Sequence, residues 1–368
     1  MNICVLIIWK LFLFFLNLYP ITKNREMKKR KQATMLLMMG VNLIILILSS
    51  CGKNKDHVSN SDLFQSRDTL KPIVKYLDGS SKMMDIVTMD NYYIVLNEVE
   101  AHEAQLAVYD KKTLKYLYSF IEKGHGNNEV IALEMLQNPK GDTLEVIDQA
   151  KYKIIKYHIG RDKAKILGDL FLDIPNVGPW QEIYKLNDSV IVYNDLDETL
   201  NTVNTKNSKI ISTYNVRDSL GLKEENKDVA DFHFVFYDNK LCLGFRRINA
   251  LTLGKVDDMG KIDIANMEDV KSKIDKSDDR IYYWFVDMNH DYILAQYMGY
   301  NPGFISRAAN IKLFAPKYEM EIYSSNLKPY KHVIPKVDIL RCKIAKNGRN
   351  IYSWNPMDDN SNILKFSY

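Results

Sequence analysis

The residue with the clearest chemical potential is Cys51, which follows an apolar run and stands directly behind two serines. The apolar run is Met35–Leu48, and four consecutive cationic residues, Lys28–Lys31, precede it. A positive segment, an apolar segment and a cleavage zone of small residues are the three parts of a secretory signal. The pattern therefore predicts export of the chain, with cleavage next to Cys51.

Leu48-Ser49-Ser50-Cys51 resembles the lipobox of bacterial lipoproteins. The resemblance implies that Cys51 becomes the acylated first residue of the mature chain and anchors it in a membrane. The alternative is an ordinary signal or membrane helix that happens to end in cysteine. Met35–Leu48 is shorter than the roughly 20 apolar residues that span a bilayer, which favours the signal. Gly52 and Lys53 form no obvious inner-membrane retention signal, so we expect outer-membrane delivery, facing the periplasm or the exterior.

The first 26 residues contain a second apolar stretch, which Lys10 interrupts. Translation from Met27 would place the cationic cluster directly behind the initiator, as in a signal peptide. A start at Met1, with two hydrophobic segments, is the alternative. We therefore divide the chain into an upstream extension (1–26), a signal peptide (27–50), a polar tether (51–62) and one folded domain (63–368).

The positive charge of the whole chain comes from the targeting segment. The full sequence has 50 Lys and Arg against 46 Asp and Glu, but residues 1–50 contain seven of the basic residues and only one acid. From Cys51 onward the net charge is therefore near −2. This balance removes the electrostatic basis for nucleic-acid binding, so we expect no nucleic acid among the partners.

No set of residues has the spacing of a catalytic or metal-binding motif. The seven histidines form no HxxxH or HxH pattern, and neither a Gly-x-Ser-x-Gly elbow nor a nucleophile–base pair is apparent. Six aspartates near predicted strand ends could ligate a cation in a central channel or cap turns: Asp85, Asp148, Asp195, Asp197, Asp231 and Asp287. We accordingly assign no catalytic residue, no metal and no cofactor.

Only two cysteines follow Cys51 in the chain, and both lie in apolar strand patterns. Cys242 and Cys342 belong to repeats that are not adjacent, whereas a disulfide needs Cα atoms within about 7 Å. We therefore expect two buried free thiols.

A turn followed by a short strand recurs six times after the tether. Each copy has Asn, Asp or Gly just before a β-branched or aromatic run, as in Asp90–Val95. Equivalent points are spaced 51, 46, 51, 52 and 58 residues apart, at Tyr93, Leu144, Val190, Leu241, Ile293 and Ile351. Six copies at a nearly constant period indicate a repeat architecture.

Each copy contains four candidate strands, which in the first copy are residues 84–89, 92–97, 105–109 and 114–120. Six such units predict an all-β fold, a six-bladed β-propeller with four strands per blade; a stacked solenoid is the alternative. The sixth copy has only three strands, and Leu70–Leu77 would supply the fourth and close the ring. The apolar spacing of Asn266–Asp279 predicts a short helix between blades four and five.

A lipid-modified cysteine, a short tether and six four-stranded repeats resemble the TolB-like six-bladed propeller lipoproteins of Gram-negative, Bacteroides-type envelopes. Lys123–Glu129 strengthens the resemblance, because it is similar to the Gly-x-Gly-Pro-x-Glu turn of that group, with Asn127 where proline is common. The resemblance implies an envelope-anchored propeller. It specifies no activity, since propellers carry many unrelated functions.

Two segments are candidates for ligand binding. Gly124–Glu129, which contains His125, could cradle an anion on its backbone N–H groups. It could equally be a blade-to-blade turn that uses glycine for positive φ, and we favour the turn. A longer loop within blade five presents Tyr300, Phe304 and Arg307. Loops on a rigid scaffold commonly carry function, so we expect these three residues to contact a partner.

The sequence favours a lipid-anchored, non-enzymatic module that binds an envelope protein, a peptide or a glycan. The alternative is a channel-centred hydrolase or lyase that acts on carbohydrate or peptidoglycan-derived material. Three or more convergent Asp, Glu or His side chains at one point of the channel would favour the enzyme. A plugged or apolar channel would favour binding.

Overall fold

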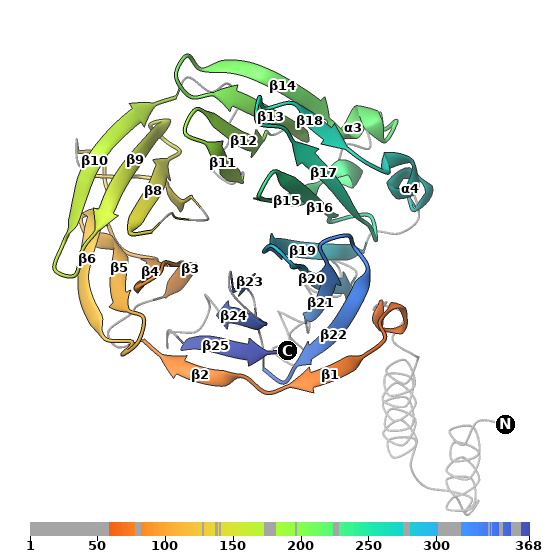
Figure 1. Cartoon of the computed structure of the whole chain (residues 1–368), viewed down its shortest axis with the longest axis horizontal. Coiled ribbons are helices and arrows are strands. Elements are labelled where there is room, and N and C mark those ends of the chain that lie inside the picture. The colour runs from red at the N-terminus through yellow and green to blue at the C-terminus, as the bar shows by residue number, and fades with distance from the viewer. Residues whose placement is uncertain are drawn as a thin grey trace, which may run out of the picture. The chain divides into compact units, whose positions relative to one another are not determined.

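Short β-branched and aromatic runs separated by turn residues fold each repeat into one antiparallel sheet. In blade 1 the four strands pair in chain order: β3 (Met83–Thr88), β4 (Tyr92–Asn97), β5 (Ala104–Asp110) and β6 (Tyr116–Glu122). Six such sheets stand in a ring around a central channel (Figure 1). The structure confirms the prediction of a six-bladed propeller with four strands per blade.

The structure is a computed structural model. It describes residues 59–368 except 78–81, 127–128, 137–138, 140, 173–181, 196, 224–227, 275–279, 301–317, 338, 340, 346–348 and 355–361. These residues belong to one unit of the chain, Asp56–Tyr368. None of the helices in this part of the chain has the length and apolar character needed to span a bilayer. Cys51 and the predicted signal peptide lie outside the described residues.

The other blades follow the same order from the inner to the outer strand. Blade 2 comprises β7 (Leu133–Met135), β8 (Thr143–Asp148), β9 (Lys153–Ile159) and β10 (Ala164–Phe171), and blade 3 comprises β11 (Ile183–Asn187), β12 (Val190–Asn194), β13 (Thr199–Asn204) and β14 (Lys209–Asn215). Blade 4 comprises β15 (Phe232–Tyr237), β16 (Lys240–Phe245), β17 (Leu251–Val256) and β18 (Ile262–Ile264). Blade 5 comprises β19 (Ile281–Met288), β20 (Tyr292–Tyr300), β21 (Glu319–Ser324) and β22 (Pro329–Pro335). Blade 6 comprises β23 (Arg341–Ile344), β24 (Asn350–Trp354), β25 (Asn362–Ser367) and the N-terminal β2 (Ile73–Tyr76).

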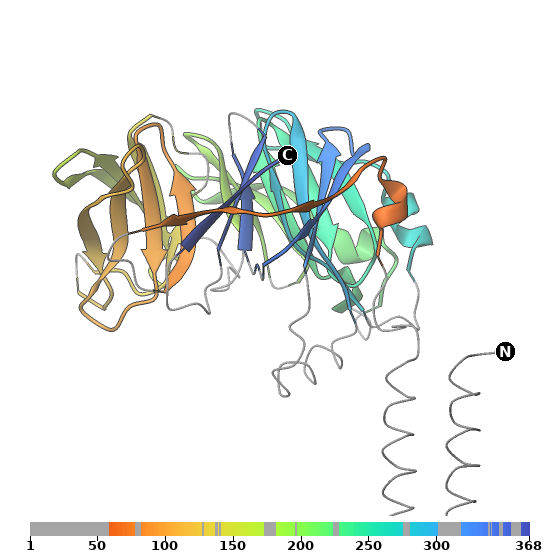
Figure 2. The same ribbon diagram turned by 90° about the horizontal axis from the view of Figure 1, so that it is seen from below.

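The N-terminal segment supplies one strand that closes the ring and a second strand that extends blade 5. β2 pairs antiparallel with β25, which confirms the predicted closure of the last blade. Leu70, however, belongs to a separate strand, β1 (Arg67–Leu70), which pairs parallel with β22 and adds a fifth strand to blade 5. The two strands run one after the other along the outer rim, across the ends of blades 5 and 6 (Figure 2). The parallel fifth strand has no signal in the sequence, because its pairing partner lies more than 260 residues away.

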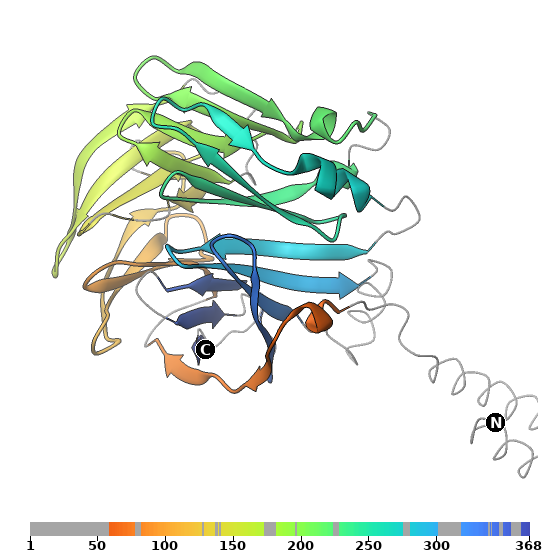
Figure 3. The same cartoon turned by 45° about the vertical axis from the view of Figure 1, so that its right-hand side comes forward.

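Among the residues that the structure describes, three short helical segments interrupt the all-β pattern. α4 (Met267–Ser272) lies between blades 4 and 5, where the sequence predicts a helix, and it buries Met267 and Val270. α3 (Val216–Ser219) follows blade 3 and is capped by Asn215, whose side chain accepts a hydrogen bond from Asp218 N. η1 (Ser61–Leu63) precedes β1 beside blade 5 (Figure 3).

The hydrophobic core fills the space between neighbouring blades. Its largest cluster joins blades 3, 4 and 5, with Phe234, Phe245 and Tyr297 among its fully buried side chains. Cys242 and Cys342 are buried free thiols, as predicted. Burial raises the pKa of Cys242 to about 12, so this thiol stays protonated and acts as a small apolar side chain.

Candidate functional site

The inner strands of the six blades line the central channel and begin at the same face of the ring. Each blade has four antiparallel strands, so the link from one blade to the next always returns the chain to this face. We call it the connection face. It carries residues just before and at the start of the inner strands, together with the links between blades.

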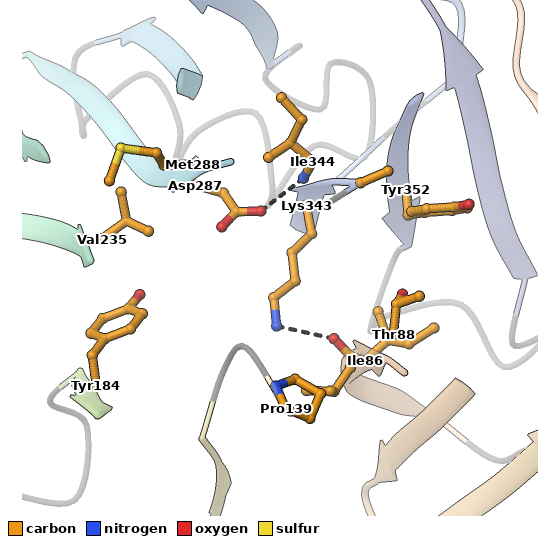
Figure 4. A pocket seen from close by; sticks show the side chains of 12 residues that line it. Ile86, Thr88, Pro139, Tyr184, Val235, Asp287, Met288, Lys343, Ile344 and Tyr352 are labelled. Atoms are coloured by element: carbon orange, nitrogen blue, oxygen red, sulfur yellow. Dashed lines mark hydrogen bonds between the residues drawn. The ribbon is translucent and has the colours of Figure 1, made fainter. Parts of the chain in front are cut away.

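A small cavity lies within the channel, and residues from all six blades line it. Its volume is about 50 Å³. Because one water molecule needs roughly 10–15 Å³, the cavity has room for only a few waters. Figure 4 shows the side chains that reach it, one or more from each blade: Ile86, Pro139, Tyr184, Val235, Asp287 and Lys343.

Lys343 is the cation at the centre of this cavity. Its Nζ lies 2.7 Å from Asp85 Oδ1 and donates to the carbonyl oxygen of Ile86 at 3.1 Å. The ammonium therefore ties blade 6 to the neighbouring blade 1 at the channel. Asp287, from blade 5, accepts a hydrogen bond from Ile344 N at 2.7 Å. Burial raises the pKa of Asp287 to about 6. Asp85 and Asp287 thus occupy the channel positions that the sequence suggested for them.

Glu134, on the inner strand of blade 2, lies close enough to Glu182 and Asp85 for their charges to act on it. Burial raises the pKa of Glu134 well above its usual range, and the charges of Glu182 and Asp85 raise it further. The side chain of Gln149 donates to Glu134 through its Nε2. Glu134 therefore keeps its proton to a higher pH than an exposed glutamate does.

A network of two carboxylates, a histidine and an arginine runs from blade 3 to blade 4 at the connection face. Glu182 contacts Nδ1 of His233, and Nε2 of His233 lies 2.9 Å from Nε of Arg246. Arg246 in turn pairs with Asp231 at 3.2 Å, and its guanidinium lies over the ring of Trp284 at 5.3 Å. Four residues on two blades are thereby held in a fixed order.

The partners of His233 define its tautomer. A guanidinium can only donate, so Nε2 of His233 must accept from Arg246. Nδ1 then carries the proton and donates to Glu182. Both ring nitrogens are engaged, so His233 can take a proton from a substrate only after Arg246 moves away. These contacting side chains hold Arg246 and Trp284 in place. They do not supply a general base with a free ring nitrogen.

The remaining aspartates singled out in the sequence hold turns. Asp195 Oδ1 accepts from Asp197 N and Thr199 N, each at 3.0 Å. Asp148, which is buried, accepts from Ala150 N at 3.2 Å. Of the six aspartates, two therefore face the channel, one pairs with Arg246, and three belong to turns. Within the described part of the chain, no group of three or more His, Cys, Asp or Glu side chains is arranged to hold a metal.

The glycine-rich segment at His125 binds its own carboxylate. Glu129 Oε2 accepts from Gly126 N at 2.8 Å, and a Cβ on Gly124 would lie only 2.0 Å from the same oxygen. Lys151 donates to the carbonyl oxygens of Gly126 and Glu129. The backbone N–H of Gly126 that an external anion would use is thus occupied, which fits the turn. Neither Gly124 nor Gly126 has a positive φ, however, so that part of the prediction is wrong. His125 itself is exposed at the connection face.

The loop predicted to bind a partner is only partly described. Tyr300 is the last residue of β20, lies opposite Ile281 of β19, and packs against the core between blades 5 and 6. Phe304 and Arg307 lie outside the described residues. Contact of these three side chains with a partner stays a prediction.

Sequence reasoning missed five residues that the ring brings together: Glu134, Glu182, His233, Arg246 and Lys343. Two of them share one signal, a lone Glu or His within an otherwise apolar or aromatic inner strand: Glu134 within Leu133–Met135 and His233 within Phe232–Tyr237. Superimposing the repeats on their inner strands would have found this pattern. It could not have shown which of these residues touch.

Comparison with known proteins supports the fold. No family model matches the sequence, and no curated protein matches it. The structure is similar to that of a Bacteroides fragilis protein described as exported, with a TM-score of 0.51 and 13% identity over 84% of this chain and 96% of that chain. The propeller domain of Cps50 (Swd1) from Myceliophteria thermophila (TM-score 0.49, 9% identity, 80% and 100% covered) and the WD40 repeats of RRP9 (0.46, 9%, 82% and 100%) are also similar. At these identities the likeness shows the fold alone.

Proposed function

We propose that this protein is an exported, lipid-anchored binding module of the cell envelope, which recognises a protein, a peptide or a glycan on its connection face. The observation that carries the proposal is the size of the channel cavity. At about 50 Å³ it is far smaller than the roughly 300–1,000 Å³ of sites that enclose small molecules. This cavity cannot enclose a ligand of that size, so we place recognition on a face of the ring.

The connection face offers groups suited to recognition. Arg246 and Trp284 are partly exposed, and their relative position is held by His233, Glu182 and Asp231. Tryptophan and arginine are the residues that most often dominate binding energy at interfaces. A guanidinium and an indole that are already ordered lose little conformational freedom on binding. Tyr300 belongs to the same face, as the last residue of β20.

One observation favours a second candidate, a hydrolase or lyase on carbohydrate or peptidoglycan-derived material. Glu134 has a raised pKa and interacts with the charge of Glu182. Two carboxyl groups, one protonated and one ionised, are the acid and base of glycoside hydrolysis. This reaction requires the channel mouth to admit a sugar.

Photo-crosslinking in native envelopes tests the binding face. A photoreactive phenylalanine analogue at Tyr300 should yield a discrete crosslinked product, and the same analogue at Asn239, in the β15–β16 turn at the opposite face, should yield none. Alanine substitution of Tyr300, Phe304 and Arg307 together should reduce the product from a probe placed at Arg247. Products from both faces, or from neither, would contradict the proposal.

Glycan turnover separates the two functions. The purified protein should leave peptidoglycan fragments and envelope glycans intact. If it cleaves one of them and Glu134→Gln abolishes the cleavage, the enzyme replaces the binding module. A Glu98→Gln variant, changed at an exposed surface site, controls for effects of lost charge.

The lipid anchor is tested separately. Replacing Cys51 with alanine should abolish incorporation of a labelled fatty acid and release the protein from the membrane fraction. Replacing the buried Cys342 with alanine should leave both unchanged. Persistent acylation in the Cys51→Ala variant would contradict the anchor but not the binding face.

A further inference from the structure

A pair of asparagines holds the segment that leads into β1 against two blades. Asn60 and Asn249 each donate to the side-chain oxygen of the other, at 3.0 Å and 2.9 Å. Asn60 also donates to the hydroxyl of Tyr283 at 3.3 Å, and this contact is buried. Asn249 belongs to blade 4 and Tyr283 to blade 5. We call the pair of Asn60 and Asn249 the asparagine clip, and it joins these two blades.

The clip acts on the chain neighbours of the arginine and tryptophan of the connection face. Asn249 lies in the turn between β16 and β17, three residues after Arg246. Tyr283 directly precedes Trp284 in β19. The backbone links the same two elements, because Tyr282 N donates to the carbonyl oxygen of Arg246 at 2.8 Å. The position of the guanidinium over the indole therefore depends on how this turn sits against β19, and the clip fixes that arrangement.

Residues 59–70, which we call the latch segment, have few apolar contacts with the ring. Only Asn60 and Phe64 are buried among these residues. The ring of Phe64 lies against His332, whose Nδ1 has no hydrogen-bond partner among the described residues, and neither has Oε1 of Glu321. Opening of the segment would let water reach both buried atoms. A segment with few buried apolar contacts opens at a lower free energy than the core does. β2 pairs with blade 6, so the ring can stay closed when the latch segment opens.

We propose that Asn60 is a positioning residue for Arg246 and Trp284, so that a closed latch segment and a bound partner stabilise each other. When the segment opens, the β16–β17 turn loses its side-chain link to β19, and a partner must first order the pair again. Linkage makes the effect reciprocal: a partner that binds the ordered pair also favours the closed segment. This coupling rests on the binding function proposed above. It connects the binding face to the part of the chain that leads to the proposed lipid anchor.

Hydrogen exchange of the purified full chain tests the positioning without a partner. In the Asn60→Ala variant, peptides that contain the hydrogen-bonded amides of Arg246 and Ala250 should exchange about tenfold faster or more, as should the latch segment. Ser61→Ala is the matched control, because its hydroxyl contacts only the exposed Asp62, and it should change neither region. β25 should exchange alike in all three proteins. Unchanged exchange at the turn, or an equal rise in β25, would overturn the proposal.

A double-mutant cycle tests the coupling to binding, with the crosslinked product from a photoreactive probe at Tyr300 as the readout. Asn60→Ala and Asn249→Ala should each reduce this product about fivefold or more, and the double variant should reduce it no further, because either substitution breaks the clip. Losses that add, or unchanged product in both single variants, would overturn the coupling. If the probe gives no product in the otherwise unchanged protein, the proposed binding face is wrong, and hydrogen exchange still decides whether Asn60 positions the turn.

Discussion

The outer edge of blade 5 is covered by a further strand of the chain, whereas among the described residues the outer edge of blade 2 is not. At blade 5, β22 is covered by the parallel strand β1, and polar groups are buried beneath the segment that leads into it. His332 pairs with Glu319 at 2.9 Å, and Ser59 donates to the same carboxylate at 2.9 Å. At blade 2, β10 has no strand of its own chain against its outer side among the described residues, and its side chains are apolar and exposed.

The covered edge of blade 5 accepts a specific segment, because polar groups are buried there. Tyr323 donates to the buried carboxyl group of Glu321 at 2.6 Å, and Asn60 donates to the hydroxyl of Tyr283 at 3.3 Å. Phe64 lies against the rings of both Tyr323 and His332. Buried polar groups cost free energy unless they find partners, so only a segment with these side chains can cover the edge. The apolar edge of β10 imposes no such demand.

Removing the covering segment should produce the largest effect. Deletion of residues 59–76, which removes β1 and β2, opens two sheet edges and exposes the polar cluster under blade 5. We expect the melting temperature to fall by roughly 10 °C or more. A synthetic peptide of residues 59–77 added in trans should restore part of the loss. A truncated protein that melts like the full domain would show that the closure contributes nothing.

Removing the buried histidine should cost about 3 kcal/mol of unfolding free energy. His332→Ala leaves the carboxylate of Glu319 buried without its main partner, and breaking one half of a buried pair is strongly destabilising. The control is His102→Ala. His102 pairs with Glu129 but its side chain is 76% exposed, and we expect less than about 0.5 kcal/mol. Urea unfolding measures the loss of unfolding free energy in each variant. Equal losses would contradict a stabilising role for the buried pair of His332 and Glu319.

The buried carboxyl group of Glu321 should make the covered edge sensitive to pH. Burial raises its pKa to about 8, so the folded state holds a proton that the unfolded chain releases near pH 4.5. Stability from this group is complete below pH 4.5 and is lost as the pH rises to about 8, by about 1.4 kcal/mol per pH unit.

The variant Glu321→Gln should remove this dependence. At pH 5 the variant should unfold at the same urea concentration as wild type or at a lower one. At pH 8 it should unfold at a higher urea concentration than wild type. The measurement is a set of urea unfolding curves between pH 5 and pH 9. Parallel pH profiles for the two proteins would show that the carboxyl group does not retain its proton.

The open edge should show the smallest effect on folding. Phe171→Ser removes a ring that is 66% exposed, so the unfolding free energy at low protein concentration should change by less than about 0.5 kcal/mol. Phe366→Ala, at a fully buried position of β25, should cost about 3–5 kcal/mol. A large loss on Phe171→Ser in the monomer would mean that the ring packs within its own chain.

Local sequence patterns predict most of the fold and little of the site. β4 begins and ends where the pattern of Tyr92–Asn97 predicts, since turn residues and strand propensity act over a few residues. Asp85 and Asp287 could be suggested for the channel from their places in the repeats. Glu134, Glu182 and Lys343 could not be grouped with them, because inner strands about fifty residues apart meet only when the ring closes.

The sequence by itself determines the number of blades, the strands within each, and the need for an N-terminal strand to complete the last one. These features follow from turn chemistry and from the period of the repeat. The tertiary structure alone decides that β1 adds to blade 5, that His233 is held between Glu182 and Arg246, and that residues of six blades line a cavity of about 50 Å³. The reason is physical: pairing partners and charge neighbours depend on distances through space that ring closure sets, whereas strand and turn preferences depend on each residue and its immediate neighbours.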